Sequence, residues 1–178
     1  MKKLIIVATL LFSLQNFAQK TFEVYNFTGQ TVKLWDIITK PNGAAIYPEF
    51  HSKPYGAVTI PPGGSYTLVN TANIFKFPFQ SPTSIPYINN WERLNSASST
   101  TPLASPVAWS LGSSNTQVFK SIIFEVGTSW NNLTVPIGTI SIAPAVTGPG
   151  SAWQLDYDCS QPDPAGQPNL WYYTIVIY

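Results

Sequence analysis

The stretch NLWYYTIVIY, residues 169–178, decides the fold class of this chain. It holds no charge, no glycine and no proline, and apolar, aromatic or β-branched residues fill both of its alternating sets. A half-exposed strand would show one polar set, so this composition predicts an inner strand, paired on both edges and covered on at least part of both faces. Its aromatic end also resembles the closing strand of a small outer-membrane barrel, which is the alternative interpretation.

Short runs of Val, Ile, Thr, Tyr, Phe and Trp precede this segment, separated by Pro, Gly, Asn and Ser. The longest is QVFKSIIFEV at residues 117–126, and no segment after the N-terminus keeps a helical period. About eight to ten short strands of this kind predict an all-β fold, an antiparallel β-sandwich, with a small closed β-barrel as the alternative. Several runs are shorter than the roughly 9–11 residues of a membrane strand, which favours the sandwich.

Turn residues predict two hairpins. TFEVYNF at 21–27 and TVKLWDII at 31–38 flank the turn TGQ, and AVTI at 57–60 and SYTLVNT at 65–71 flank PPGG.

Two stretches are expected to be long surface loops that could present binding residues. Residues 39–55 begin near the turn signal PNG, and residues 80–106 combine prolines with the polar run NSASSTT. Within the second, WERL at 91–94 is expected to form one helical turn at most.

The N-terminus has the three parts of a secretory signal peptide. Lys2 and Lys3 form a basic region, an apolar stretch runs from 4 to 14, and the small residue Ala18 ends a short polar region. The apolar stretch is shorter than the roughly 20 residues of a membrane span, which disfavours a membrane anchor. We therefore expect cleavage of residues 1–18 and export of one all-β domain, residues 19–178, to the periplasm, cell surface or exterior of a bacterium.

Charge and cysteine content narrow the function further. Without Lys2 and Lys3 the mature chain has 7 basic against 8 acidic residues, a formal charge of −1. Such a chain has no basic surplus with which to neutralise phosphates, so a nucleic-acid partner is not expected. The single cysteine, Cys159, cannot form an internal disulfide, so stability must come from the core.

His51, in EFHSK, is the one histidine and would have to serve any Ser-His-Asp triad. No GxSxG motif accompanies it. Its flanking residues Pro48 and Pro54 predict an exposed loop histidine, although Glu49 and His51 would share a face on a strand and could then hold a metal or act as a base. We therefore expect no catalytic residues and a non-enzymatic protein, with a secreted hydrolase as a further alternative.

Three aspartates, Asp156, Asp158 and Asp163, lie in DYDCSQPD. Loop carboxylates can bind calcium, but this spacing does not match an EF-hand, and aspartates also end strands and open loops. No cofactor is expected, and calcium at these three residues is the alternative.

Tryptophan is the most informative residue type, with six in the chain. Trp91 and Trp130 occur in polar, turn-like settings, where they could be exposed anchors or core residues; the other four lie in strand-like runs typical of a core. The sequence thus predicts an exported binding or structural β-sandwich that presents aromatic-containing loops to a glycan or an envelope protein. A small outer-membrane barrel remains the alternative.

Overall fold

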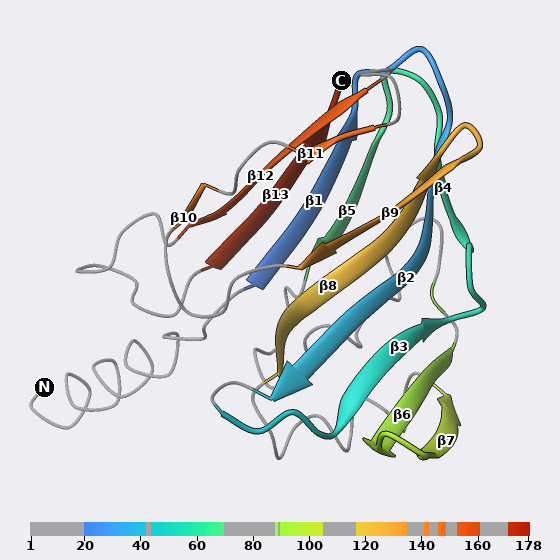
Figure 1. The fold of residues 1–178 in the computed structure, drawn as a ribbon, viewed down its shortest axis with the longest axis vertical. Helices are drawn as coiled ribbons and strands as arrows, with labels where there is room; N and C mark the ends of the chain where they lie inside the picture. The colour runs from blue at the N-terminus through green and yellow to red at the C-terminus, as the bar shows by residue number, and fades with distance from the viewer. Residues whose placement is uncertain are drawn as a thin grey trace, which may run out of the picture.

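The computed structural model describes residues 20–41, 44–69, 88, 90–104, 117–134, 141–142, 146–148, 153–160 and 171–178. Their strands form two sheets that lie against each other (Figure 1), which confirms the predicted β-sandwich. Within these residues no helix has the length and apolarity needed to cross a membrane. The predicted signal peptide, residues 1–18, lies outside the described residues.

The first sheet has six strands. Its order is β10 (Ser141–Ile142), β12 (Gln154–Ser160), β13 (Trp171–Ile177), β1 (Lys20–Asn26) and β5 (Ser65–Val69), and β11 (Val146–Thr147) also pairs with β12. Strand β13 pairs antiparallel with β12 and parallel with β1, so the red and blue strands lie side by side in Figure 1.

The second sheet has seven strands, and all of its pairings are antiparallel. Its order is β7 (Ser99–Ala104), β6 (Asn90–Ser96), β3 (Glu49–Lys53), β2 (Val32–Pro41), β8 (Gln117–Val126) and β9 (Ser129–Thr134), and β4 (Val58–Ile60) also pairs with β2. Strand β8 spans the residues predicted as the longest run, and Gly127, with φ of 60°, makes the tight turn into β9.

The C-terminal segment is an inner strand, as its composition predicts. Tyr173, Ile175 and Ile177 are buried against the other sheet, whereas Thr174 and Val176, on the opposite face, are half-buried. Hydrogen bonding on both edges and one fully covered face explain why this segment carries no charge.

An aromatic chain joins the two sheets through the core. The ring of Phe119, on β8, lies 4.6 Å from that of Phe22 on β1 and 4.9 Å from that of Tyr173 on β13, centroid to centroid. Tyr66 on β5 extends this contact edge-on to Phe22 at 6.5 Å. All four side chains are buried, so they contribute strongly to sandwich stability.

Both hairpin predictions are wrong. Strand β1 belongs to the six-stranded sheet and β2 to the seven-stranded sheet. In the second predicted hairpin, β4 belongs to the seven-stranded sheet and β5 to the six-stranded sheet. The two short connections therefore cross from one sheet to the other instead of folding a strand back onto its neighbour.

The side chain of Asn26 holds these two crossovers together. Its amide nitrogen donates to the carbonyl oxygens of Gln30 (2.8 Å) and Ile60 (3.0 Å), one from each crossover region. Its amide oxygen accepts from the backbone N–H (3.0 Å) and the hydroxyl (2.7 Å) of Thr28. Asn26 is completely buried, so these bonds compensate the loss of water around its amide.

The predicted loops at 39–55 and 80–106 are also wrong where the structure describes them. The first contains β3, and the second contains the strands β6 and β7, which pair with each other. WERL at 91–94 is therefore extended and not a helical turn. Main-chain pairing with strands on both edges of β6 stabilises a conformation that the polar local sequence does not favour by itself.

Candidate functional site

The outer surface of the six-stranded sheet carries exposed aromatic side chains. Because side chains alternate along a strand, residues between the buried positions point away from the other sheet. Val176, on β13, pairs with Tyr25 on one side and with Asp156 on the other. The residues that come directly after the last β1–β13 pair are Phe27 and Tyr178, on the same surface. We call this surface the aromatic face, and it consists of Glu23, Tyr25, Phe27, Gln154, Asp156, Val176 and Tyr178.

Three rings give the aromatic face its apolar area. Phe27 is 64% exposed and Tyr178 is 46% exposed. The rings of Tyr25 and Phe27 are parallel within 6°, with centroids 6.3 Å apart. Exposed aromatic rings are poorly accommodated by water, so their gathering on one surface makes it a candidate binding site.

Hydrogen bonds among its own side chains order the aromatic face. The hydroxyl of Tyr178 donates to Asp156 Oδ2 (2.6 Å) and accepts from the amide of Gln154 (2.7 Å), and Tyr25 donates to Glu23 Oε2 (3.1 Å). The bond to Asp156 raises the pKa of Tyr178, and burial together with Glu23 raises the pKa of Tyr25. Both hydroxyls therefore stay protonated at neutral pH, with their rings held in place.

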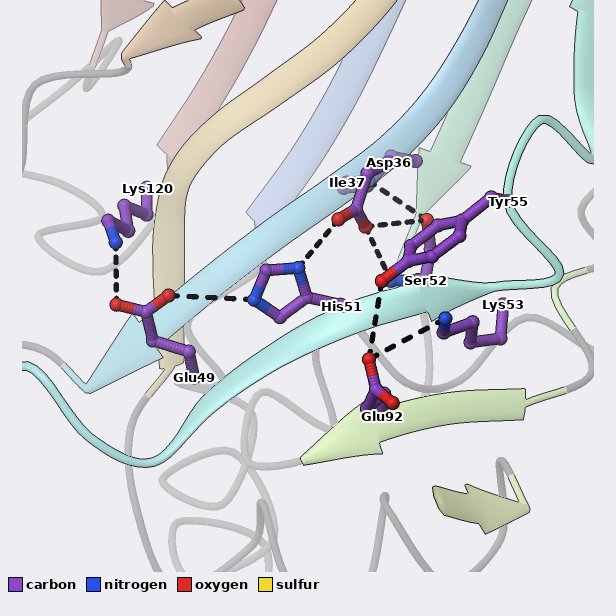
Figure 2. A network of polar contacts seen from close by, with 9 residues as sticks. All are labelled: Asp36, Ile37, Glu49, His51, Ser52, Lys53, Tyr55, Glu92 and Lys120. Atoms are coloured by element: carbon purple, nitrogen blue, oxygen red, sulfur yellow. Dashed lines mark hydrogen bonds and ion pairs between the residues drawn. The ribbon is translucent and has the colours of Figure 1, made fainter. Parts of the chain in front are cut away.

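A second polar cluster, the His51 network, joins three strands of the seven-stranded sheet (Figure 2). His51 Nδ1, on β3, lies 2.6 Å from Asp36 Oδ2 on β2, and its Nε2 lies 3.5 Å from Glu49 Oε2. The other oxygen of Glu49 binds the ammonium of Lys120, on β8. Asp36 Oδ1 accepts from the backbone N–H (2.9 Å) and the hydroxyl (3.3 Å) of Ser52.

An interruption in strand pairing creates this network. Strands β3 and β4 pair with different parts of the same edge of β2, and a bulge lies between Leu34 and Asp36. At this gap the backbone N–H of Ile37 donates to the hydroxyl of Ser52 (2.9 Å) instead of to a strand carbonyl. Side chains thus replace the missing ladder bonds, and the buried Asp36 is fixed in place.

The two carboxylates determine the charge of His51. Burial by itself lowers the pKa of the imidazole, but hydrogen bonding and charge from Asp36, and then Glu49, outweigh it and raise the pKa above 6.5. The protonated ring can donate from both nitrogens. Ser52 donates to Asp36 and not to His51, so these residues do not form the nucleophile–base pair of a hydrolase. The arrangement is that of a structural ion network.

Tyr55 is exposed in the turn between β3 and β4, at the edge of this cluster (Figure 2). Its hydroxyl donates to Glu92 Oε2 at 3.2 Å, and the ammonium of Lys53 lies 3.2 Å from its ring centroid. A cation therefore already occupies one face of this ring, in contrast to the clustered rings of the aromatic face.

The structure corrects the interpretation of Trp91 and of His51. Trp91, on β6, has no exposed surface, so of the two possibilities that the sequence left open it is a core residue and not an exposed binding anchor, and Leu103 pairs opposite it. The backbone of Trp130 pairs with Glu125, but its side chain lies outside the described residues. His51 lies on a strand and not in an exposed loop, and it shares a face with Glu49 as their spacing predicts.

The three aspartates proposed for calcium are described only in part. Asp156 belongs to the aromatic face, and its two oxygens accept from Tyr178 and Gln154. Asp158 has its backbone on β12, and Asp163 lies outside the described residues. Among the described side chains no group of three or more His, Cys, Asp or Glu is arranged to hold a metal.

Sequence reasoning missed the aromatic face, although part of its signal was present. Glu23, Tyr25 and Phe27 alternate with apolar residues in TFEVYNF, as expected for the outer face of a strand. The parallel pairing that places Tyr178 beside Phe27 joins the two ends of the chain, and no local pattern encodes it.

Comparisons with protein families, with curated proteins and with solved structures give no match for this chain.

Proposed function

We propose that this chain is an exported, non-enzymatic β-sandwich protein that binds a glycan on the aromatic face. The observation that carries the proposal is the gathering of three aromatic rings, two of them exposed and that of Tyr25 half-buried, on the outer surface of one sheet, bordered by hydrogen-bonding side chains. Its partner site is therefore a sheet surface and not the loops that the sequence indicated.

The chemistry of the surface suits a sugar better than a purely apolar partner. A pyranose ring presents C–H groups that can pack on an aromatic ring, with hydroxyls around its edge. On the aromatic face, Glu23, Asp156 and Gln154 supply acceptors and donors around the rings, where such hydroxyls would lie. An aromatic centre with a few fixed polar groups is the usual composition of a small-ligand site.

Two further observations support a binding role outside the cytoplasm. Both nitrogens of His51, the single histidine, face carboxylates, and Ser52 is directed at Asp36, which argues against a hydrolase built on these residues. The N-terminal sequence has the form of a signal peptide. In a Gram-negative host, intact-mass measurement of the exported protein should show loss of residues 1–18, and retention of Met1 would contradict export by cleavage.

A glycan array with residues 19–178, including neutral and charged glycans, tests the binding proposal. Phe27→Ala and Tyr178→Ala should each weaken the strongest interaction by on the order of tenfold, because exposed aromatic anchors dominate binding energy. Tyr55→Ala is the matched control, since Tyr55 is 45% exposed against 46% for Tyr178 and lies away from the aromatic face, in the turn between β3 and β4. A blank array, or equal losses for all three variants, would contradict the proposal.

A further inference from the structure

The charges on the aromatic face narrow the class of glycan. Among the described side chains of this surface the charged ones are Glu23 and Asp156, and both are acidic. The faces of aromatic rings also have negative electrostatic potential and attract cations. Rings and carboxylates therefore favour the same kind of ligand group, a positive charge.

We propose that the aromatic face binds a glycan with free amino groups, a polymer of 2-amino-2-deoxyhexose, whose ammonium groups lie at Glu23 and Asp156 while its sugar rings pack on Tyr25, Phe27 and Tyr178. This inference depends on the proposed glycan-binding function and names its ligand class. An acidic glycan, with uronate or sulfate groups, would instead be repelled by the two carboxylates.

The hydrogen bonds on the surface leave the carboxylates able to accept from a ligand. Glu23 accepts from one described hydroxyl, that of Tyr25, and Asp156 accepts from Tyr178 and Gln154. An ionised carboxylate has about four lone-pair sites, so each can accept a further charge-assisted bond from an ammonium.

The positions of the two carboxylates indicate an oligomer as the occupant. Glu23 and Asp156 lie on β1 and β12, on either side of β13, and their partners on that strand are Thr174 and Val176. With strands about 4.8 Å apart and a rise of about 3.3 Å per residue, their Cα atoms are separated by roughly 12 Å. Consecutive units of a chain span such a separation more readily than a single hexose ring does.

Two hexasaccharides test the inference, one with free amino groups and one in which the same amino groups are acetylated. Calorimetric titration of residues 19–178 at pH 5.5 and low salt would compare the hexamer of glucosamine with that of N-acetylglucosamine. Ordinary carboxylates are ionised at this pH and primary amines are protonated. We expect the free-amine hexamer to bind roughly two- to fivefold more tightly, as for a partly exposed ion pair, and this preference to vanish near 1 M salt.

Charge-removing variants locate the effect. Glu23→Gln and Asp156→Asn should each reduce the preference for the free-amine hexamer, measured as the ratio of its affinity to that of the acetylated hexamer. Glu92→Gln, which removes a charge on the other sheet, should leave the preference unchanged.

The outcomes of these titrations distinguish failure of the amino-sugar inference from failure of the proposed glycan-binding function. Equal affinity for the two hexamers, or tighter binding of the acetylated one, overturns the amino-sugar inference and leaves the proposed glycan-binding function in place. Binding of neither hexamer, with a blank array, overturns both. A lysine-rich peptide that binds more tightly than either hexamer, with the same dependence on Glu23 and Asp156, would identify a basic protein segment as the occupant and overturn the inference.

Discussion

Replacing Phe119 by alanine should remove a large part of the stability of the sandwich. The Phe119 ring is completely buried between the sheets and contacts Phe22 and Tyr173, both on the opposite sheet. Truncation of a buried phenylalanine to alanine costs about 3–5 kcal/mol, against a total unfolding free energy of about 5–15 kcal/mol for a domain. We therefore expect Phe119→Ala to lose from about a fifth of the stability, if the domain is very stable, to most of it, if the domain is marginal.

Urea denaturation of residues 19–178, followed by tryptophan fluorescence, measures this loss as a lower midpoint at constant slope. Phe27→Ala is the matched control, because the same side chain is 64% exposed there and its removal should change stability by about 0.5 kcal/mol or less. If Phe119→Ala does not fold, Phe119→Leu should fold and show a smaller, measurable loss of stability. Equal destabilisation by Phe119→Ala and Phe27→Ala would refute the described packing of the two sheets.

Three further changes test other parts of the structure. The free energy of unfolding should fall as the pH rises above about 6.5, because Asp36 and Glu49 raise the pKa of His51 and their stabilisation is lost as the folded imidazole deprotonates. His51→Gln should flatten this pH dependence in thermal melts from pH 6 to 9. An unchanged slope in the variant would contradict the role assigned to His51. Trp91→Ala should destabilise the domain by about 3–5 kcal/mol in urea titrations, since the indole is fully buried, and a near-neutral effect would restore it as a surface anchor. Calcium or a chelator should leave the melting temperature unchanged, because among the described side chains no three His, Cys, Asp or Glu residues are placed together to hold a metal, and a rise with calcium would contradict this expectation.

The sequence predicted elements whose signal is local. Strand β8 and the inner strand β13 were recognised from continuous runs of β-branched and aromatic residues, because burial on a sheet selects such residues over the whole length of a strand. The sandwich followed from the number and spacing of these runs.

Long-range contacts set the features that sequence reasoning missed. The turn signals predict that consecutive strands pair, whereas β1 and β2 enter different sheets. The crossover between them is bonded, through the buried amide of Asn26, to a second crossover that is distant along the chain. The turn signal PNG and the polar local sequence predict a loop at β3, whereas its stabilising partner, Asp36, comes from another strand and leaves no local signal. Trp91 occurs in a polar stretch, and only its pairing opposite Ser52 places it in the core.

The parallel pairing of β1 with β13 has a consequence for the kinetics of folding. Lys20 pairs with Trp171, so the two central strands of one sheet come from opposite ends of the sequence. Closing a loop of this length costs conformational entropy before any contact repays it, and folds with many such distant contacts form slowly. When the chain emerges N-terminus first, β1 has no β13 to pair with until residues 171–177 have been synthesised. We therefore expect refolding on the slow, millisecond-to-second side of two-state domains, and an interval in which the unpaired backbone edges and the apolar side chains of β1 and β13 are open to aggregation.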